Sequence, residues 1–461
     1  MIDIDLRNLS SSRIGPDRGL ELESETAALG PLLDRDAEAL TARRHDASEM
    51  LGWIDLPSQS ETLLDQLAEY AVTARRRADE LVVLGIGGSS LGAAAVVSAL
   101  QHPARALQAT GGEGMRVHFV DNVDADVIRG LLDTLDPSRT LINVISKSGT
   151  TAETMAGYLA FESWLRDALG EGAFRDHVVA TTDPEQGILR PLADRDGIRA
   201  FAVPPSVGGR FSVLSAVGLV PIALAGLDPR ALLRGAGRAN DGAAQPFENS
   251  VPKRAAFAQL ASAERGATIN VLMPYSTRLR RVSDWYVQLW AESLGKAENR
   301  RGARVHAGTT PLPAVGTTDQ HSQVQLFNEG PFDKVVAFIR LAEPSMDLTI
   351  PVPRAGLEAL DYLGGRSFHQ LMNAEQAATA HALAANRRPN YTLRLGALDE
   401  EHLGELLQTL MWQTALVGER HAIDAYDQPG VELGKIYTYA LMGRDGFDEQ
   451  RAELADAGVE G

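Results

Sequence analysis

The chain reads Leu81-Val82-Val83-Leu84-Gly85-Ile86-Gly87-Gly88-Ser89-Ser90-Leu91-Gly92 where its apolar pattern first becomes regular. Four consecutive apolar residues are typical of a buried strand, and the glycines and serines after them indicate a tight turn. The apolar residues from Leu91 to Leu100 then continue as a predicted helix. A buried strand, a glycine-rich turn and a helix in direct succession are typical of an α/β fold.

Further short apolar runs follow along the chain, and helix-compatible stretches separate most of them. Strands that alternate with helices are typical of a parallel sheet covered on both faces. We therefore predict an α/β fold with two doubly wound domains, mainly parallel sheets and flanking helices. The runs expected as further strands are 117–120, 141–145, 177–180, 200–203, 269–273, 335–339, 348–350 and 391–395.

The predicted domain boundary lies near residue 205, where two prolines and two glycines interrupt the pattern. Before residue 76, apolar residues fall among charges at helical spacings, which indicates a helical flank. The predicted parts are 1–75, a helical N-terminal flank; 76–205, the first α/β domain; 206–415, the second α/β domain; and 416–461, a C-terminal helical segment that carries Lys435.

Composition narrows the class of protein. A length of 461 residues suffices for two domains, and a formal net charge of −17 argues against nucleic-acid or membrane partners. The absence of cysteine fits a reducing compartment, and the longest apolar stretch, about 213–227, is short of the ~20 residues that span a bilayer. With no readable secretory signal or metal-binding His-Glu-x-x-His spacing, we expect a soluble, cytoplasmic protein without a metal.

The glycine-rich turn has three interpretations. Backbone N–H groups and the positive end of a helix dipole would meet there, which favours a phosphate. A Walker A loop is excluded because Ala93 and Ala94 stand where Lys and Ser or Thr are needed. A dinucleotide site would want Gly or Ala in place of Ser90. The turn alone leaves open a phosphate site, a dinucleotide site and a turn without ligand.

A second turn, Ser146-Lys147-Ser148-Gly149-Thr150-Thr151, follows the predicted strand 141–145 directly. Its hydroxyls could donate to phosphate oxygens, or one of them could cap the next helix. A cap needs only one hydroxyl, whereas this turn has four. Because the carboxyl ends of parallel strands meet at one edge of a sheet, the two turns predict a shared anion site there.

A predicted helix from Arg281 to Lys296 carries a third polar group. Gln288, Glu292 and Lys296 are spaced by four residues and fall on one face of such a helix. The ordinary interpretation of this spacing is a solvated ion pair between Glu292 and Lys296. A base on the same face is the alternative interpretation.

Three further residues stand out among polar turns. Arg210 follows two glycines near the predicted domain boundary, where it could simply bind carbonyl groups or a carboxylate. His321 lies in a polar loop, and lone histidines are more often structural than catalytic. Lys435 follows a turn, where a lysine is usually exposed to solvent. Each residue alone is a weak indicator of chemistry.

Together these segments resemble the glucose-6-phosphate isomerase family in its short bacterial form. They occur in the family's order and span most of the chain from residue 80 to 440. The chain departs from the longer eukaryotic form at Ser148-Gly149, where that form has Thr-Phe. The segments that carry the resemblance are 85–92, 146–151, 207–212, 292–296, 320–322 and 427–435.

The resemblance implies two sugar-isomerase (SIS) type domains, a homodimer and no cofactor. It implies the reversible isomerisation of glucose 6-phosphate and fructose 6-phosphate in glycolysis and gluconeogenesis, by ring opening and proton transfer through an enediolate. Glu292 would carry the proton and Arg210 would stabilise the enediolate. Lys435 and His321 would open the ring, with His321 contributed across the dimer interface. The implied substrate-binding residues are Gly88, Ser89, Ser146, Lys147, Ser148, Thr151, Gly209, Gln288 and Gln428.

Other functions remain as alternatives at this point. A regulatory sugar-phosphate sensor would use the same turns without catalysis, and a nicotinamide oxidoreductase would use the first glycine turn. Within isomerases, mannose 6-phosphate or an amino-sugar phosphate is a further candidate substrate.

Overall fold

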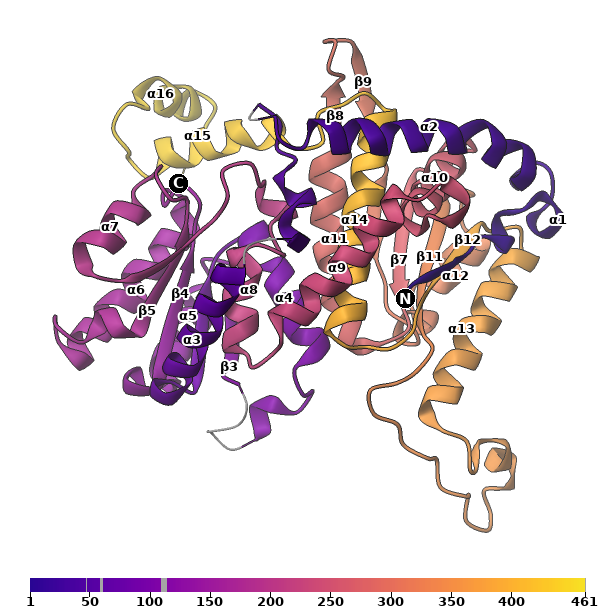
Figure 1. Ribbon diagram of the computed structural model, residues 1–461, viewed down its shortest axis with the longest axis horizontal. Coiled ribbons are helices and arrows are strands. Elements are labelled where there is room, and N and C mark those ends of the chain that lie inside the picture. The colour runs from indigo at the N-terminus through magenta and orange to yellow at the C-terminus, as the bar shows by residue number, and fades with distance from the viewer. Residues whose placement is uncertain (47, 59–60, 109–113, 461) are drawn as a thin grey trace.

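The computed structural model describes residues 1–46, 48–58, 61–108 and 114–460. These residues form two five-stranded sheets and a two-stranded ribbon. Figure 1 places the first sheet at the left and the second at the right, with helices between them. The α/β class with mainly parallel sheets, predicted from the alternating apolar runs, is confirmed.

The first sheet has the strand order β3-β2-β4-β5-β6, and all of its strands are parallel. Its inner strands are buried along their whole length, as their mainly apolar runs predicted. The strands are β2 (Glu80–Leu84), β3 (Arg116–Val120), β4 (Thr140–Ile145), β5 (Val178–Thr182) and β6 (Arg199–Ala202). The helices of this part are α3 (Glu61–Arg77), α4 (Leu91–Leu100), α5 (Ala125–Thr134), α6 (Ala152–Leu169), α7 (Leu189–Asp196) and α8 (Ala216–Leu224).

The second sheet has the order β1-β12-β11-β7-β10. Its parallel strands are β7 (Ile269–Pro274), β10 (Thr310–Pro313), β11 (Lys334–Leu341) and β12 (Asn390–Leu395), and β1 (Asp3–Asp5) pairs antiparallel with β12. The remaining helices are α1 (Ser11–Ile14), α2 (Leu22–Arg43), α9 (Pro229–Ala244), α10 (Val251–Glu264), α11 (Arg280–Leu294), α12 (Val324–Glu329), α13 (Phe368–Ala385), α14 (Glu400–Arg420), α15 (Glu432–Leu441) and α16 (Asp448–Asp456).

The two edge strands of the second sheet, β1 and β10, were not predicted from the sequence. The strand β1 has three residues and lies in the flank that we predicted to be helical. The strand β10 contains Pro311 and Pro313, which cannot donate to a ladder. Prolines are tolerated there because β10 pairs on one side only, with β7. The proposed domain boundaries stay predictions, but β1 belongs to the second sheet.

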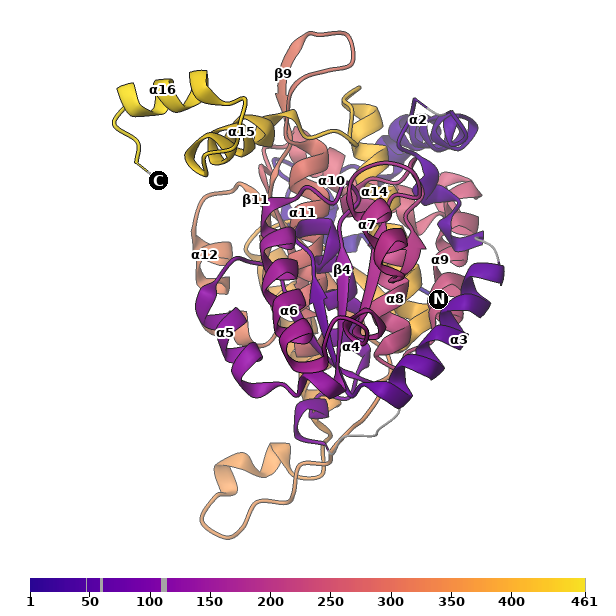
Figure 2. The same cartoon turned by 90° about the vertical axis from the view of Figure 1, so that its left-hand side faces the viewer.

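The predicted strand 348–350 is wrong. These residues lie in a projecting arm, residues 343–367, which contains the short helix η12 (Glu358–Leu363). Its two sides meet in one isolated bridge, between Thr349 and Ser367. Figures 1 and 2 show the arm extending away from the body. The apolar run that suggested a buried strand is instead exposed, with Leu348 66% accessible.

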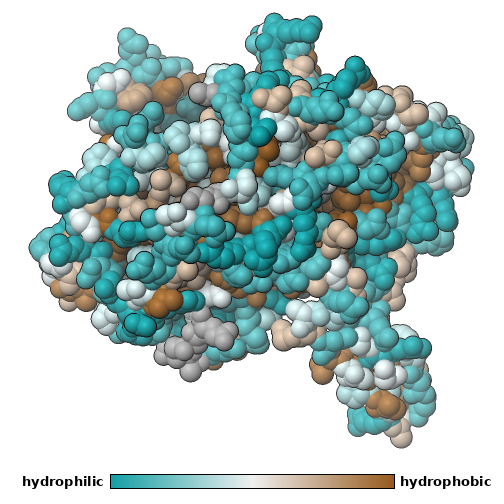
Figure 3. Space-filling model, viewed as in Figure 1, coloured by the Kyte–Doolittle hydropathy of each residue, from teal (hydrophilic) through white to brown (hydrophobic). Residues whose placement is uncertain are grey.

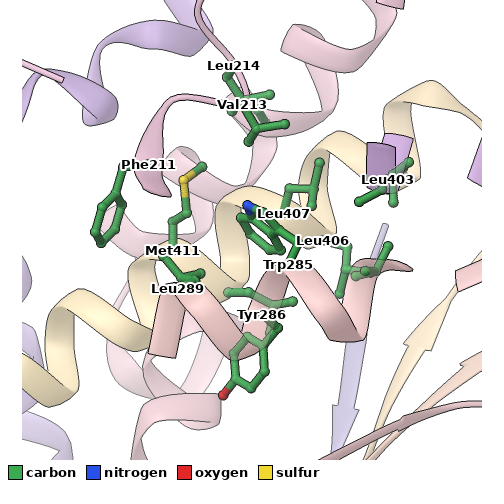
Figure 4. Close-up of a cluster of buried hydrophobic side chains, with 14 of the residues drawn as sticks. Phe211, Val213, Leu214, Trp285, Tyr286, Leu289, Leu403, Leu406, Leu407 and Met411 are labelled. Carbon is green, nitrogen blue, oxygen red and sulfur yellow. The ribbon is translucent and has the colours of Figure 1, made fainter. Parts of the chain in front are cut away.

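A continuous apolar core lies between the two sheets and fixes the elements that carry the polar residues. In Figure 4, Trp285 and Leu289 of α11 lie beside Met411 and Leu406 of α14, with Phe211 near one end. Each of these side chains is at most 1% accessible. Because burying one such side chain contributes about 1.5–3 kcal/mol, the cluster holds α11 firmly against the rest of the fold.

No helix in the described part of the chain is long and apolar enough to cross a membrane.

Candidate active site

A cavity of about 1020 Å³ lies at the carboxyl ends of the strands of the first sheet, with α11 and α15 contributing to its wall. The turns after β2, β4 and β5 all line it, as expected for ligand sites in open parallel sheets. The predicted residues that line it are Gly88, Ser89, Ser146, Lys147, Ser148, Thr151, Gly209, Arg210, Gln288, Glu292, Gln428 and Lys435. One predicted residue, His321, does not line it.

The hydroxyl-rich turn leads into an uncapped helix. Thr151 is the N-cap of α6, and its side chain makes no hydrogen bond to the first turn of that helix. The capping interpretation of this turn is therefore wrong. Thr151, Ala152 and Glu153 line the cavity, so the first turn of α6 borders it. Free N–H groups and the helix dipole make this end of α6 suited to an anion.

The serines of the turn shape it from within. The Ser146 hydroxyl accepts the N–H of Gly149 at 2.9 Å, and the Ser148 hydroxyl lies 2.9 Å from that of Thr150. Gly149 has φ +69°, and a Cβ there would lie 2.6 Å from the backbone nitrogen of Leu189. The turn is therefore preorganised around the end of β4.

Lys147 ties this turn to the segment that precedes Arg210. Its ammonium donates to the carbonyl oxygens of Pro205 at 2.7 Å and Val207 at 3.3 Å. Burial lowers the pKa of Lys147, and the charge of Asp183 opposes this shift. The ammonium thus adds positive charge beside the cavity while it fixes the neighbouring segment.

The glycine-rich turn 85–92 touches the segment 207–212 through the backbone. A Cβ on Gly88 would lie 2.2 Å from the carbonyl carbon and oxygen of Gly209. This close approach brings Ser89 and the start of α4 against the segment that carries Arg210. Only glycine at position 88 permits this distance.

We expect Gly88→Ala to lower kcat/KM about 100-fold, because the added methyl forces the two turns apart by the order of 1 Å. Steady-state kinetics and a thermal unfolding scan check this result. Gly130→Ala in α5 is the matched control, since a Cβ there meets nothing within 4 Å and its activity should be unchanged. Wild-type kinetics for Gly88→Ala would show that the close approach does not matter.

Arg210 and Glu292 face each other in the cavity. The Arg210 Nη1 atom lies 3.3 Å from the Glu292 carboxylate and 3.0 Å from the Gln428 Oε1 atom. The Arg210 side chain is only 3% exposed, whereas that of Glu292 is 34% exposed. Burial lowers the pKa of Arg210, and the charges of Glu292 and Asp427 oppose this shift. A buried guanidinium therefore stands next to an accessible carboxylate.

The rest of the guanidinium is fully engaged by the protein. Its Nε atom donates to the Ser293 hydroxyl at 2.8 Å. Its Nη2 atom donates to the carbonyl oxygens of Ala425 at 2.6 Å and Asp427 at 2.9 Å. Arg210 therefore binds both carbonyls and a carboxylate, which were its ordinary interpretations. These contacts fix the orientation of Nη1 toward the cavity.

Gln288 and Glu292 lie one turn apart on α11, as their spacing predicted. The Gln288 amide nitrogen donates to the Glu292 carboxylate at 3.3 Å. Its Oε1 atom is buried and has no hydrogen-bond partner within the described ranges of the chain. A buried acceptor without a partner is costly, so this oxygen is ready for a donor such as a sugar hydroxyl.

Comparison with known proteins gives the same picture over most of the chain. The family model described as "Phosphoglucose isomerase" matches residues 65–453. The chain is 47% identical to a protein of Thermus thermophilus named glucose-6-phosphate isomerase, over 89% of this chain and 94% of that one. It is 45% identical to the protein of the same name from Rubrobacter xylanophilus, over 91% and 96%.

The chain belongs to the phosphoglucose isomerase family.

Solved structures agree with this assignment. A crystal structure of a hypothetical protein from Thermus thermophilus has a TM-score of 0.87 and 44% identity, with 96% of this chain and all of that chain covered. A glucose-6-phosphate isomerase from Chlamydia trachomatis has a TM-score of 0.75 and 26% identity, with 95% and 88% covered. The resemblance read from the sequence motifs is confirmed.

In this phosphoglucose isomerase family member, the predicted ion pair between the side chains of Glu292 and Lys296 does not form, and that interpretation is wrong. The helix α11 ends at Leu294, and Lys296 begins the strand β8 (Lys296–Glu298), which pairs with β9 (Arg304–Ala307). Lys296 therefore leaves the helical face, and its ammonium reaches back to the end of α11.

The two residues expected to open the sugar ring are placed differently. Lys435 lies on α15, is about half exposed, and pairs with Glu432 at 2.8 Å at the border of the cavity. His321 ends the short helix η11 (Thr318–His321) and faces solvent. In a single chain, therefore, Lys435 is beside the other site residues and His321 is not.

Sequence analysis missed Asp183. It follows β5 at the same sheet edge, is 4% accessible and lines the cavity. Burial tends to raise its pKa, but the N–H groups of Glu185 and Gln186 hold that pKa below its usual range. Polar residues directly after a predicted strand indicated the other two turns, and the same pattern could have indicated Asp183.

Among the residues that the structure describes, no group of three or more His, Cys, Asp or Glu side chains could hold a metal ion.

Proposed function

We propose that this chain interconverts glucose 6-phosphate and fructose 6-phosphate, the reaction of its family in glycolysis and gluconeogenesis, with Glu292 as the base. The observation that carries the assignment of Glu292 is its 3.3 Å contact with the buried Arg210, in a cavity that also borders the uncapped start of α6. In the same cavity, the turn after β4 and the start of α6 suit a phosphate, and Glu292 offers a base beside the cation Arg210.

The phosphate would bind where Ser146, Ser148 and Thr151 meet the start of α6, with Ser89 and the first turn of α4 close by. This local site compensates for the net charge of −17, which by itself repels an anionic substrate. Anchoring the phosphate holds C1 and C2 of the sugar near Glu292, which replaces a search by diffusion with a fixed geometry.

The proton transfer would then proceed in two steps. Glu292 removes the proton from C2 of the open-chain aldose, and the electron pair of that bond forms the enediolate. The negative charge grows on the C1 oxygen, which binds the Nη1 atom of Arg210 in place of the carboxylate. As Glu292 returns the proton to C1, the proton of the C2 hydroxyl moves to the C1 oxygen, so that C2 becomes the ketose carbonyl and C1 carries the hydroxyl. Gln288 and Gln428 would hold the sugar hydroxyls.

Ring opening requires a proton to leave the C1 hydroxyl and another to reach the ring oxygen. We assign this exchange to Lys435 and to His321 of the partner subunit, because His321 lies outside the cavity of its own chain. A homodimer would complete the site.

The projecting arm supports a homodimer. It exposes Val352 at 79%, Tyr362 at 70% and Leu348 at 66%, and Figure 3 shows a few apolar residues among hydrophilic ones on it. Large apolar side chains exposed on a projecting segment would be covered in a complex with a partner. A second copy of the chain is the partner that also explains the position of His321.

Mixed dimers test this arrangement. We expect Glu292→Gln and His321→Asn each to be nearly inactive, and an equal mixture refolded together to regain about a quarter of wild-type activity. Half of the dimers would be mixed, and each mixed dimer would have one intact site. No regained activity, although native mass spectrometry with one variant isotope-labelled shows mixed dimers, would place His321 in its own chain's site or outside the mechanism.

The reaction itself is tested by conversion of fructose 6-phosphate to glucose 6-phosphate with EDTA present and no cofactor supplied to the enzyme. Turnover is the expected result. Binding without turnover would favour a sugar-phosphate sensor, and NAD(P)-dependent oxidation would favour an oxidoreductase. Mannose 6-phosphate and amino-sugar phosphates, tested in parallel, define the substrate range. The proposed location is the cytoplasm, which suits a chain without cysteine.

A further inference from the structure

Lys296 is a buried cation just beyond the end of α11, and no step of the proposed mechanism uses it. Its side chain is 5% exposed. Its ammonium donates to three carbonyl oxygens: those of Glu292 at 2.5 Å, Ser293 at 3.1 Å and Asp427 at 3.0 Å. The Asp427 carboxylate lies 3.5 Å away. Lysine has three N–H donors, so these three carbonyls match its full capacity.

The three carbonyls belong to the two segments that carry the proposed base, Glu292, and the proposed sugar-binding residue Gln428. Two of them end α11, at the residue that supplies the base and at Ser293, whose hydroxyl accepts from Arg210. The third belongs to Asp427, immediately before Gln428, and the same oxygen also accepts from Arg210 at 2.9 Å. Lys296 and Arg210 thus hold the same two segments from neighbouring points.

The chemistry of the ammonium group explains why position 296 has lysine and not arginine. The chain has only five lysines among 44 basic residues, so lysine is not its default cation. Burial and the charge of Arg210 lower the pKa of Lys296, and Asp427 opposes this shift. A planar guanidinium directs its donors outward in a fork, whereas an ammonium directs all three from one atom. Three convergent carbonyls therefore need lysine.

We infer that Lys296 is a positioning residue for the isomerisation. It fixes the backbone of Glu292 and of the 427–428 segment, and so keeps the Glu292 carboxylate, Arg210 and Gln428 at fixed distances from one another. This inference rests on the proposed role of Glu292. The alternative is that Lys296 makes a contact at the end of α11 that contributes to stability alone.

The two interpretations differ in kinetics. A misplacement of about 1 Å in reacting groups costs on the order of 100-fold in rate. The proposed phosphate contacts come from the turn after β4 and the start of α6, which Lys296 does not contact. We expect Lys296→Met to lower kcat about 100-fold and to change KM by less than about threefold. Lys296→Arg should recover little of the loss, because its fork cannot meet three carbonyls at one point.

Lys253→Met is the matched control. Lys253 is 3% accessible and donates to the Asp34 carboxylate and the Gln245 carbonyl, away from the cavity. It should lose stability without a change in kcat. Far-UV circular dichroism and thermal unfolding establish that each variant is folded. If Lys296→Met does not fold, Lys296→Gln, which keeps two N–H donors, is measured under the same criteria.

Two outcomes would overturn the inference. One is a folded Lys296 variant with kcat within about threefold of wild type. The other is an equal fall of kcat in the Lys253 control, which would indicate general destabilisation. Glu292→Gln, measured alongside, separates this failure from failure of the proposed mechanism: an active Glu292→Gln removes the base assignment whatever Lys296 does.

Discussion

Glu292→Gln is expected to lower kcat about 10⁴-fold, at the upper end of what a positioned base contributes. The amide has nearly the shape of the carboxylate but cannot accept a proton from carbon. KM should change little, because the proposed phosphate contacts come from other elements, the turn after β4 and the start of α6. Initial rates with fructose 6-phosphate and with glucose 6-phosphate measure both parameters.

The control for this change is Glu298→Gln, an exposed glutamate of β8 that does not line the cavity. It should behave as wild type. If Glu292→Gln instead raised KM and kept kcat, Glu292 would be a binding residue, and the base would have to be sought among the other groups of the cavity.

Arg210→Ala is expected to lower kcat about 100-fold or more and to raise KM far less. Removing one donor to a developing oxyanion typically costs about 3 kcal/mol, which corresponds to roughly that factor. Arg210→Lys should remain impaired, since lysine keeps the charge but not the fork that joins Glu292 to the Ala425 and Asp427 carbonyls. The separate values of kcat and KM decide the result.

Arg388→Ala is a suitable control, because Arg388 is also buried and bonds a carbonyl, that of Pro331, away from the cavity. The opposite pattern for Arg210→Ala, with KM raised and kcat intact, would make Arg210 a residue of ground-state binding only.

Much of the fold followed from local patterns. The mainly apolar runs predicted every strand of the first sheet, and the helix from Leu91 to Leu100 has the bounds that its composition indicated. The two turns at the sheet edge were predicted to converge because their strands are parallel neighbours, and both line one cavity. Helical spacing likewise placed Gln288 beside Glu292.

What the sequence did not reveal depends on tertiary context. The edge position of β10 makes its prolines harmless, and the exposed arm carries an apolar run that looked like a strand. Lys296 appeared to continue a helical face, but α11 ends two residues earlier. The carbonyls of Ala425 and Asp427, which orient Arg210, have no sequence signature because any residue supplies a carbonyl.

Deuterium exchange at C2 tests the role of Glu292 most directly. Glucose 6-phosphate would be incubated in D₂O with wild-type protein or with Glu292→Gln, and the C2 proton signal followed by NMR. We expect the wild-type protein to replace C2 protons with deuterium during isomerisation. For the variant we expect exchange at least about 10³-fold slower, while it still binds the substrate. Exchange by Glu292→Gln at close to the wild-type rate would contradict the account, because another group would then be removing the proton.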